Sequence, residues 1–121
     1  MVRILVTGGR DYTNFEKVKE VFIELCEEFG EENITLIHGN ARGLDSIARD
    51  IGEFLELDII AYPVKPDEWK KLGKIAGHIR NKRMLVEGKP DFLIAFPGGK
   101  GTANMIKIAQ NAKLPIRRIL C

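Results

Sequence analysis

The sequence has no long apolar run and few cysteines, which excludes several classes of protein. No apolar stretch approaches the roughly 18 residues that a membrane-spanning helix needs. The first residues enter a predicted strand, without the apolar segment and cleavage site of a signal peptide. The two cysteines, Cys26 and Cys121, make neither a disulfide framework nor a metal-ligand spacing. We therefore expect a cytoplasmic protein with no membrane association, no metal and no cofactor.

An excess of charge of one sign and an abundance of aromatic residues are also missing. The formal net charge is +2, and aromatic residues make up 7% of the 121 residues. Neither a broad basic surface nor a stacking platform for nucleic acid is therefore indicated. The exception is the segment 65–83, where seven lysines and arginines stand against two acidic residues. Such a segment attracts phosphate groups, although a solvated helix face would also explain it.

Short apolar runs alternate with segments in which apolar residues recur every three or four positions. The runs predict strands, and the spaced segments predict amphipathic helices. The expected strands cover residues 4–6, 34–37, 57–62, 91–96 and 116–120. The expected helices cover residues 15–29, 45–55, 75–87 and 103–109, with a loop at 64–73. In the last helix, Ala103, Ile106 and Ala109 are expected to face inward.

This alternation predicts an α/β fold. Strands that alternate with helices form a parallel sheet with right-handed crossovers. We therefore expect residues 1–121 to form a single Rossmann-like, three-layer domain with a parallel sheet of about five strands.

Glycine-bearing loops follow the first, second and fourth predicted strands. All strand-to-helix loops of a parallel sheet lie at one edge, and ligands bind there where the strand order reverses. Glycine lets the backbone approach a ligand, and the N–H groups at a helix start favour an anion. Three such loops, two with an arginine, favour a phosphate site over simple turns. The predicted ligand-binding residues of these loops are Gly8, Gly9, Arg10, Gly39, Arg42, Gly43, Asp45, Pro97, Gly98, Gly99, Gly101 and Thr102.

Two common phosphate-binding motifs are absent. The dinucleotide fingerprint G-x-G-x-x-G does not follow the first strand, and no acidic residue ends the second strand. In the last loop Lys100 precedes Gly101 and Thr102, whereas the Walker A motif needs a Gly-Lys-Ser/Thr run. A standard dinucleotide dehydrogenase and an ATPase are therefore disfavoured.

The segment 77–84 adds basic and amide side chains near the start of the third predicted helix. Arg80 and Asn81 are predicted to reach a phosphate or a ribose, because arginine suits bidentate phosphate contacts. His78 and His38 have no evident partner in the sequence, so a structural role is the simpler interpretation. Trp69 either stacks on a base or anchors its loop.

Four blocks of the sequence carry a family resemblance. They are VTGGRDY at 6–12, HGNARGLD at 38–45, AGHIRNKRM at 76–84 and AFPGGKGTANM at 95–105. In this order they resemble the YspA-type, cpYpsA-related branch of the SLOG superfamily, which also contains the Lonely Guy phosphoribohydrolases and the DNA-processing protein DprA. The resemblance implies a Rossmann-like fold, a homodimer, and a nucleotide-derived ligand such as an ADP-ribose derivative. It implies a ligand class and not a reaction.

The sequence departs from these relatives at two positions. The Lonely Guy enzymes carry Pro-Gly-Gly-x-Gly-Thr-x-x-Glu with a catalytic glutamate, and the matching residue here is Met105. A thioether is neither an acid nor a base, and the neighbouring Asn104 does not replace a carboxylate, so no catalytic residue is assigned. In addition, His78 stands where the branch usually has proline, a residue that fixes a helix start.

Three functions follow, in decreasing order of support. The first is binding or sensing of a nucleotide-derived, phosphate-bearing ligand at the glycine loops. The second is a nucleosidase or phosphoribohydrolase-like enzyme whose acid–base group is Asp11, Asp45 or His78. The third is DprA-like binding of single-stranded nucleic acid through residues 65–83 and Trp69, which the small net charge and the few aromatic residues disfavour.

Overall fold

Strands and helices alternate along the chain in the computed structural model, which describes residues 1–121. Five parallel strands form one sheet in the order β3-β2-β1-β4-β5. The strands are β1 (Val2–Thr7), β2 (Ile34–His38), β3 (Asp58–Ala61), β4 (Phe92–Ala95) and β5 (Ile116–Arg118). The helices are α1 (Phe15–Phe29), α2 (Leu44–Phe54), α3 (Pro66–Leu72), α4 (Lys74–Val86) and α5 (Lys100–Asn111), with a 3-10 turn at Glu31–Asn33. The predicted Rossmann-like α/β fold is confirmed.

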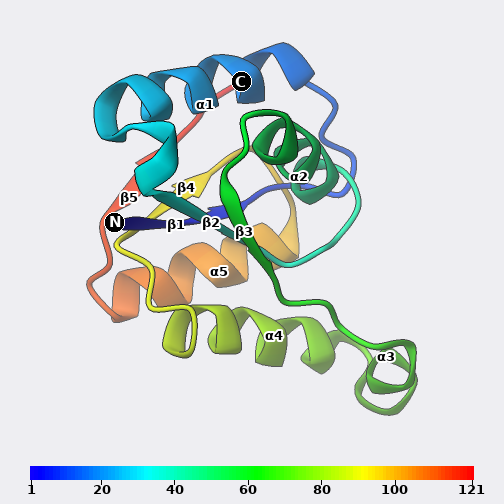
Figure 1. Cartoon of the computed structure of the whole chain (residues 1–121). Helices are drawn as coiled ribbons and strands as arrows, with labels where there is room; N and C mark the ends of the chain where they lie inside the picture. The colour runs from blue at the N-terminus through cyan, green and yellow to red at the C-terminus, as the bar shows by residue number, and fades with distance from the viewer.

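Helices cover both faces of the sheet. In Figure 1, α1 and α2 lie on one face and α4 and α5 on the other. Successive side chains of a strand point to opposite faces, so Ile4 and Val6 belong to the core under α1 and α2. Leu5 belongs to the second core, under α4 and α5. None of the helices has both the length and the apolar character that crossing a bilayer requires.

The strand order reverses at β1, which pairs with both β2 and β4. From β1 the chain runs outward to β3, then crosses to β4 and continues to β5 on the other side. The β1–α1 and β4–α5 loops therefore lie side by side at the carboxyl edge of the sheet. The Gly9 N–H donates to the Pro97 carbonyl at 2.9 Å and joins the two loops. The first and last glycine-bearing loops thus meet because β1 pairs with β4.

Two local predictions are wrong. Residues 64–73 are not a loop, because Pro66–Leu72 form α3. Proline at the first helical position and a bond of 3.0 Å from the Lys65 N–H to Glu68 Oε1 begin this helix. In α5, Ala103 is exposed instead of facing inward, because the helix is rotated relative to the prediction. The buried residues of α5 are Thr102, Met105 and Ala109.

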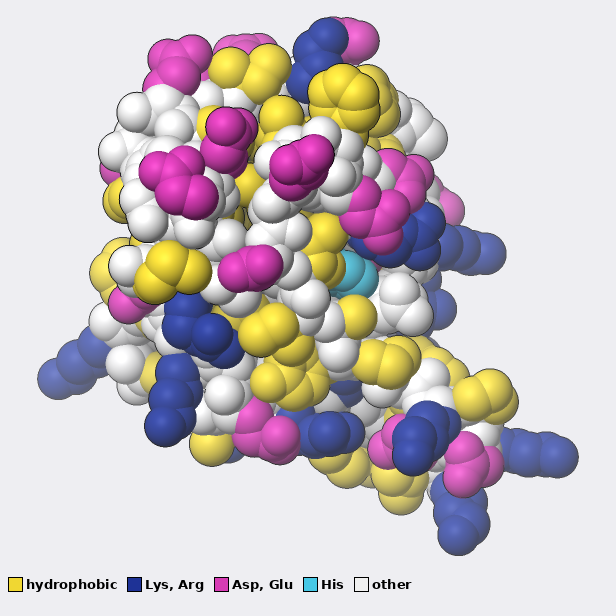
Figure 2. Space-filling view, viewed as in Figure 1, with side chains coloured by type: hydrophobic (Ala, Val, Ile, Leu, Met, Phe, Trp, Pro, Cys, Tyr) yellow, Lys and Arg dark blue, Asp and Glu magenta, His cyan; other side chains and the backbone are white.

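Charged side chains are unevenly distributed over the surface. In the face shown in Figure 2, acidic side chains gather over the upper part, where α1 and α2 lie. Most lysine and arginine side chains in this view lie over the lower part and around α3. The basic segment 65–83 accounts for this difference, since it forms α3 and most of α4.

Candidate ligand-binding site

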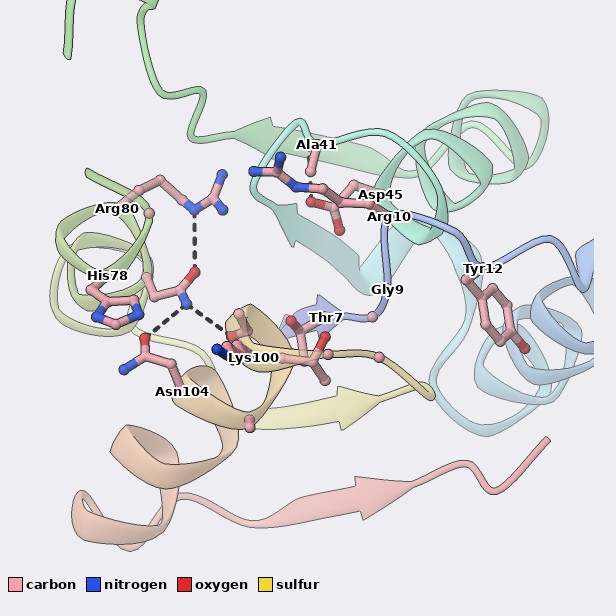
Figure 3. A pocket seen from close by; sticks show the side chains of 18 of the residues that line it. Thr7, Gly9, Arg10, Tyr12, Ala41, Asp45, His78, Arg80, Lys100 and Asn104 are labelled. Atoms are coloured by element: carbon pink, nitrogen blue, oxygen red, sulfur yellow. Dashed lines mark hydrogen bonds between the residues drawn. The ribbon is translucent and has the colours of Figure 1, made fainter. Parts of the chain in front are cut away.

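A cavity of about 960 Å³ lies at the carboxyl edge of the sheet, between the β1–α1 loop, the β4–α5 loop and α4 (Figure 3). This volume is at the upper end of the roughly 300–1,000 Å³ that small-molecule sites occupy. Five lysine and arginine side chains line it, against two aspartates, so its electrostatic potential favours an anion. These charged residues are Arg10, Lys74, Arg80, Lys100, Lys107, Asp11 and Asp45.

The structure brings most of the predicted site residues together. Eleven of the fourteen line the large cavity. A neighbouring cavity of about 310 Å³ is lined by two more, Gly39 and Arg42, whereas Gly43 lines neither. The eleven residues are Gly8, Gly9, Arg10, Asp45, Arg80, Asn81, Pro97, Gly98, Gly99, Gly101 and Thr102.

The β4–α5 loop offers free backbone N–H groups to the large cavity. No side chain caps the N-terminus of α5, and the N–H groups of residues 100–102 have no acceptor within the protein. The first N–H of this turn with a partner is that of Ala103, which donates to the Gly99 carbonyl at 3.0 Å. A Cβ added at Gly99 or Gly101 would meet no atom within 4 Å. The unpaired N–H groups and the helix dipole together attract an anion.

Gly9 and Gly98 are required by packing between loops. A Cβ added at Gly98 would clash with Thr102 Oγ1 and would lie 2.7 Å from the Gly9 nitrogen. A Cβ added at Gly9 would lie 3.1 Å from the Gly98 Cα. The Gly9 N–H already donates to Pro97 and is not available to a phosphate. These two glycines serve the contact between β1–α1 and β4–α5.

The β2–α2 loop is also rich in glycine, but the N–H groups of residues 39–41 are bonded within the loop and to Asp45. Asp45 Oδ2 accepts the N–H of Gly39 at 3.2 Å and that of Ala41 at 3.1 Å. His38 Nδ1 accepts the N–H of Asn40 at 2.9 Å. Burial raises the pKa of the Asp45 carboxyl, while these backbone donors and nearby guanidinium groups lower it. The N–H groups of residues 39–41 are therefore not available to an anionic ligand.

Gly43 has a packing role instead of a place on a cavity wall. Its φ is +74°, a conformation that side chains disfavour. A Cβ there would clash with the Gly9 carbonyl and the Arg10 backbone. The following Leu44 N–H donates to the same Gly9 carbonyl at 3.1 Å. Gly43 thus lets the β2–α2 loop contact the β1–α1 loop closely.

His38 is a neutral, buried side chain at the end of β2. Burial, with a smaller effect of the Arg49 and Arg80 charges, lowers its pKa from 6.5 to about 4. Nδ1 accepts a hydrogen bond, so the proton of the neutral ring is on Nε2, which is buried without a partner. The ring is 1% exposed and lines neither cavity. This environment fits a structural role. By contrast, the exposed His78 lines the large cavity.

Arg80 is fixed between the β2–α2 loop and the two helices below the sheet. Its Nη1 donates to the Gly39 carbonyl, and its Nε donates to Asn81 Oδ1 at 3.2 Å. Asn81 is 4% exposed and donates through Nδ2 to Asn104 Oδ1 at 3.0 Å and to the Gly101 carbonyl at 3.2 Å. Figure 3 shows this chain of bonds from Arg80 to Asn104. Burial lowers the pKa of Arg80, but a guanidinium stays charged.

Met105 does not belong to the cavity. It is fully buried in the core with Leu5 and Met84, and it is absent from the wall. Its neighbour Asn104 lines the wall instead. The position that matches the glutamate of the Lonely Guy enzymes is therefore a core position here, without an acid or a base.

The helix α3, which the sequence did not predict, adds Trp69 to the wall of the large cavity. The Arg10 guanidinium carbon lies 5.1 Å from the centre of the Trp69 ring. The same ring packs on Gly77 of α4, where an added Cβ would lie 3.4 Å from it. Arg10 and Trp69 line both cavities. Trp69 thus anchors α3 and keeps one aromatic surface at the wall.

The strand order and the cavity together define a Rossmann-like α/β protein with a cavity at the switch point of its sheet. A family model described as the YspA, cpYpsA-related SLOG family matches residues 2–71. The match covers more than half of the chain, and the chain belongs to this family. Membership connects the protein with nucleotide-related binding or function. None of the curated proteins and none of the solved structures compared with the chain matches it.

Proposed function

We propose that the protein binds a nucleotide-derived, phosphate-bearing ligand in the large cavity. The observation that carries this proposal is the uncapped N-terminus of α5, whose free N–H groups lie in a wall with five cationic side chains. Phosphate is a preferred anion of such an arrangement. The volume of about 960 Å³ leaves room for a base and a sugar beside the phosphate.

The polar groups of the wall divide into binding and positioning residues. The N–H groups of residues 100–102 and the Lys100 ammonium would hold the phosphate. Asn104 would offer its amide nitrogen to the ligand, since its oxygen already accepts a bond from Asn81. The exposed Asp11 carboxylate would accept a ribose hydroxyl. Asn81 is a positioning residue, because both ends of its amide are bonded within the protein.

Thermal unfolding with nucleotides tests this proposal. A ligand present at about 100 times its Kd adds about 2.7 kcal/mol to stability, which raises Tm by several degrees. The panel consists of nucleoside mono-, di- and triphosphates and ADP-ribose compounds. Gly101→Ala should fold but lose most of the rise, because its methyl group would enter the open space near the α5 N–H groups. The control Asn111→Ala changes the far end of α5, outside the large cavity. A panel without any rise in Tm would contradict the proposal.

A second candidate function, hydrolysis of an N-glycosidic bond, is favoured by one observation. Asp45, whose pKa burial raises, lines the same cavity, and such a carboxyl is a candidate proton donor. The test is incubation with nucleoside 5′-monophosphates and detection of the free base, with Asp45→Asn as the inactive variant. The absence of released base would contradict this second candidate.

We also propose a homodimer, as the family resemblance implies. Three apolar side chains of α4 support it: Ile75, Ile79 and Val86 are 59%, 43% and 57% exposed. Their spacing places the three residues on one side of α4, and an exposed apolar patch marks a site of protein association. Light scattering should give twice the mass of the 13.6 kDa chain, and Ile79→Glu should shift the mass to that of a monomer.

A further inference from the structure

The smaller cavity is an extension of the large one toward the β2–α2 loop. Its volume is about 310 Å³. Half of the residues of its wall also line the large cavity, so the two cavities are adjacent. The shared residues are Arg10, Ala41, Trp69 and Arg80. The remaining residues of its wall are Gly39, Asn40, Arg42 and Val64.

Three arginines and no carboxylate line this smaller cavity. Two of them are already fixed, since Arg10 packs against Trp69 and Arg80 is bonded to Gly39 and Asn81. The third, Arg42, is exposed and makes no hydrogen bond or ion pair within the protein. Arg10 and Arg80 lie near the Asp45 carboxylate, so Arg42 is the arginine of this wall with no carboxylate partner. Its guanidinium group is suited to a bidentate contact with phosphate.

The N–H groups of residues 39–41 cannot take the place of the arginines. The N–H groups of Gly39, Asn40 and Ala41 already donate to Asp45 and His38. An anion in the smaller cavity would therefore be bound by side chains, whereas an anion at α5 would be bound by backbone N–H groups. The two cavities thus differ in the groups that they offer to an anion.

We propose that the smaller cavity is a second phosphate subsite, and that the ligand is a nucleotide with phosphate groups at two separate positions. This assignment rests on the proposed function and deepens it by naming the ligand class, a nucleoside bisphosphate. One phosphate binds at the N-terminus of α5. The other binds Arg42 together with Arg10 and Arg80. A diphosphate chain, whose two phosphates are adjacent, would place both groups near one subsite.

Calorimetric titration at one fixed salt concentration tests the second subsite. The ligands are the 5′-monophosphates, the 5′-diphosphates and the 3′,5′-bisphosphates of adenosine, guanosine, cytidine and uridine. The proteins are the wild type, Arg42→Ala and the control Arg83→Ala, which removes an exposed arginine outside both cavities. For the base that binds, we expect the bisphosphate to bind about tenfold more tightly than the monophosphate and the diphosphate. Arg42→Ala should remove this advantage, and Arg83→Ala should keep it.

The outcomes separate the subsite from the proposed function. Equal affinities for monophosphate and bisphosphate in the wild type would overturn the second subsite and leave nucleotide binding standing. Equal losses of affinity for both ligands in Arg42→Ala, or tightest binding of the diphosphate, would also overturn it. The absence of binding by every nucleotide would contradict the proposed function itself, and the second subsite would fall with it.

Discussion

The β2–α2 and β4–α5 loops have similar glycine-rich sequences at the same edge of the sheet, yet their backbones differ in what they can bind. In the β2–α2 loop, Asp45 and His38 accept the N–H groups of residues 39–41. In the β4–α5 loop, the N–H groups of residues 100–102 have no acceptor in the protein. Glycine-rich backbone therefore has N–H groups bonded within the protein in one loop and unpaired N–H groups in the other.

A nearby anionic side chain accounts for this difference. Asp45 follows Gly39 by six positions and reaches back to the loop from the first turn of α2. Residues 96–105 contain no acidic side chain, so nothing competes with a ligand for the N–H groups of α5. Where a carboxylate lies within reach of a glycine loop, it can accept the N–H groups of that loop, which are then not free to bind a phosphate.

The largest expected effect is that of Asp45→Ala, which would remove the acceptor that closes the β2–α2 loop. Two N–H groups would lose their partner at about 2 kcal/mol each, so the free energy of unfolding should fall by about 4 kcal/mol. Urea denaturation measures this fall. Asp45→Asn keeps an acceptor oxygen and should lose about half as much. A variant Asp45→Ala as stable as the wild type would show that the two loops do not differ in this way.

Acid should weaken the β2–α2 loop, because protonation of His38 removes the acceptor of the Asn40 N–H. The pKa of His38 is about 4 in the folded protein, against 6.5 for a free side chain. A pKa lowered by folding contributes stability that is complete above pH 6.5 and is lost as the pH falls toward 4. Since a tenfold change in proton affinity is about 1.4 kcal/mol, the loss should approach about 3 kcal/mol.

Urea denaturation between pH 7 and pH 4 measures this loss, with His38→Gln as the reference. Glutamine does not titrate in this range, so subtraction of its pH dependence removes the effect of the carboxylates. If both proteins lose the same stability on acidification, His38 is not the group responsible.

Alanine at two glycines of the β4–α5 loop should change stability in opposite directions. Gly98→Ala should lower the free energy of unfolding by about 2 kcal/mol, because its Cβ would clash with Thr102. Gly101→Ala lies in open space within α5 and should raise it by about 0.5 kcal/mol. Chemical denaturation of both variants distinguishes a tight position from an open one. A loss of stability in Gly101→Ala would mean that the loop is closed there as well.

A similarly small effect concerns Arg10 and Trp69, which line both cavities. A cation over an aromatic ring contributes about 0.5–1 kcal/mol at an exposed site. The double-mutant cycle of Arg10→Ala and Trp69→Ala should therefore give a coupling energy in this range. A coupling energy near zero would show that α3 is held by the Trp69 packing on Gly77 alone.

The sequence predicted the centre of the sheet well because β1, β2 and β4 are largely buried and read as mainly apolar runs. The edge strands β3 and β5 are partly exposed. The sequence did not predict α3, which buries no residue and has no apolar stripe. The start signals of α3 were visible, namely Pro66 followed by Asp67 and Glu68. The roles of the glycines were not visible, because Gly98 and Gly101 differ only in what lies opposite them in space.

The reversal of strand order at β1 also means that the two halves of the chain share one site. Arg10 and Asp45 come from the half that ends with β3, whereas Asn81 and the start of α5 come from the half that follows. A ligand that contacts residues of both halves would connect them without a covalent bond and would stabilise the pairing of β1 with β4. Its presence should then slow amide hydrogen exchange in those two central strands, deep in the sheet, as well as in the loops that touch it.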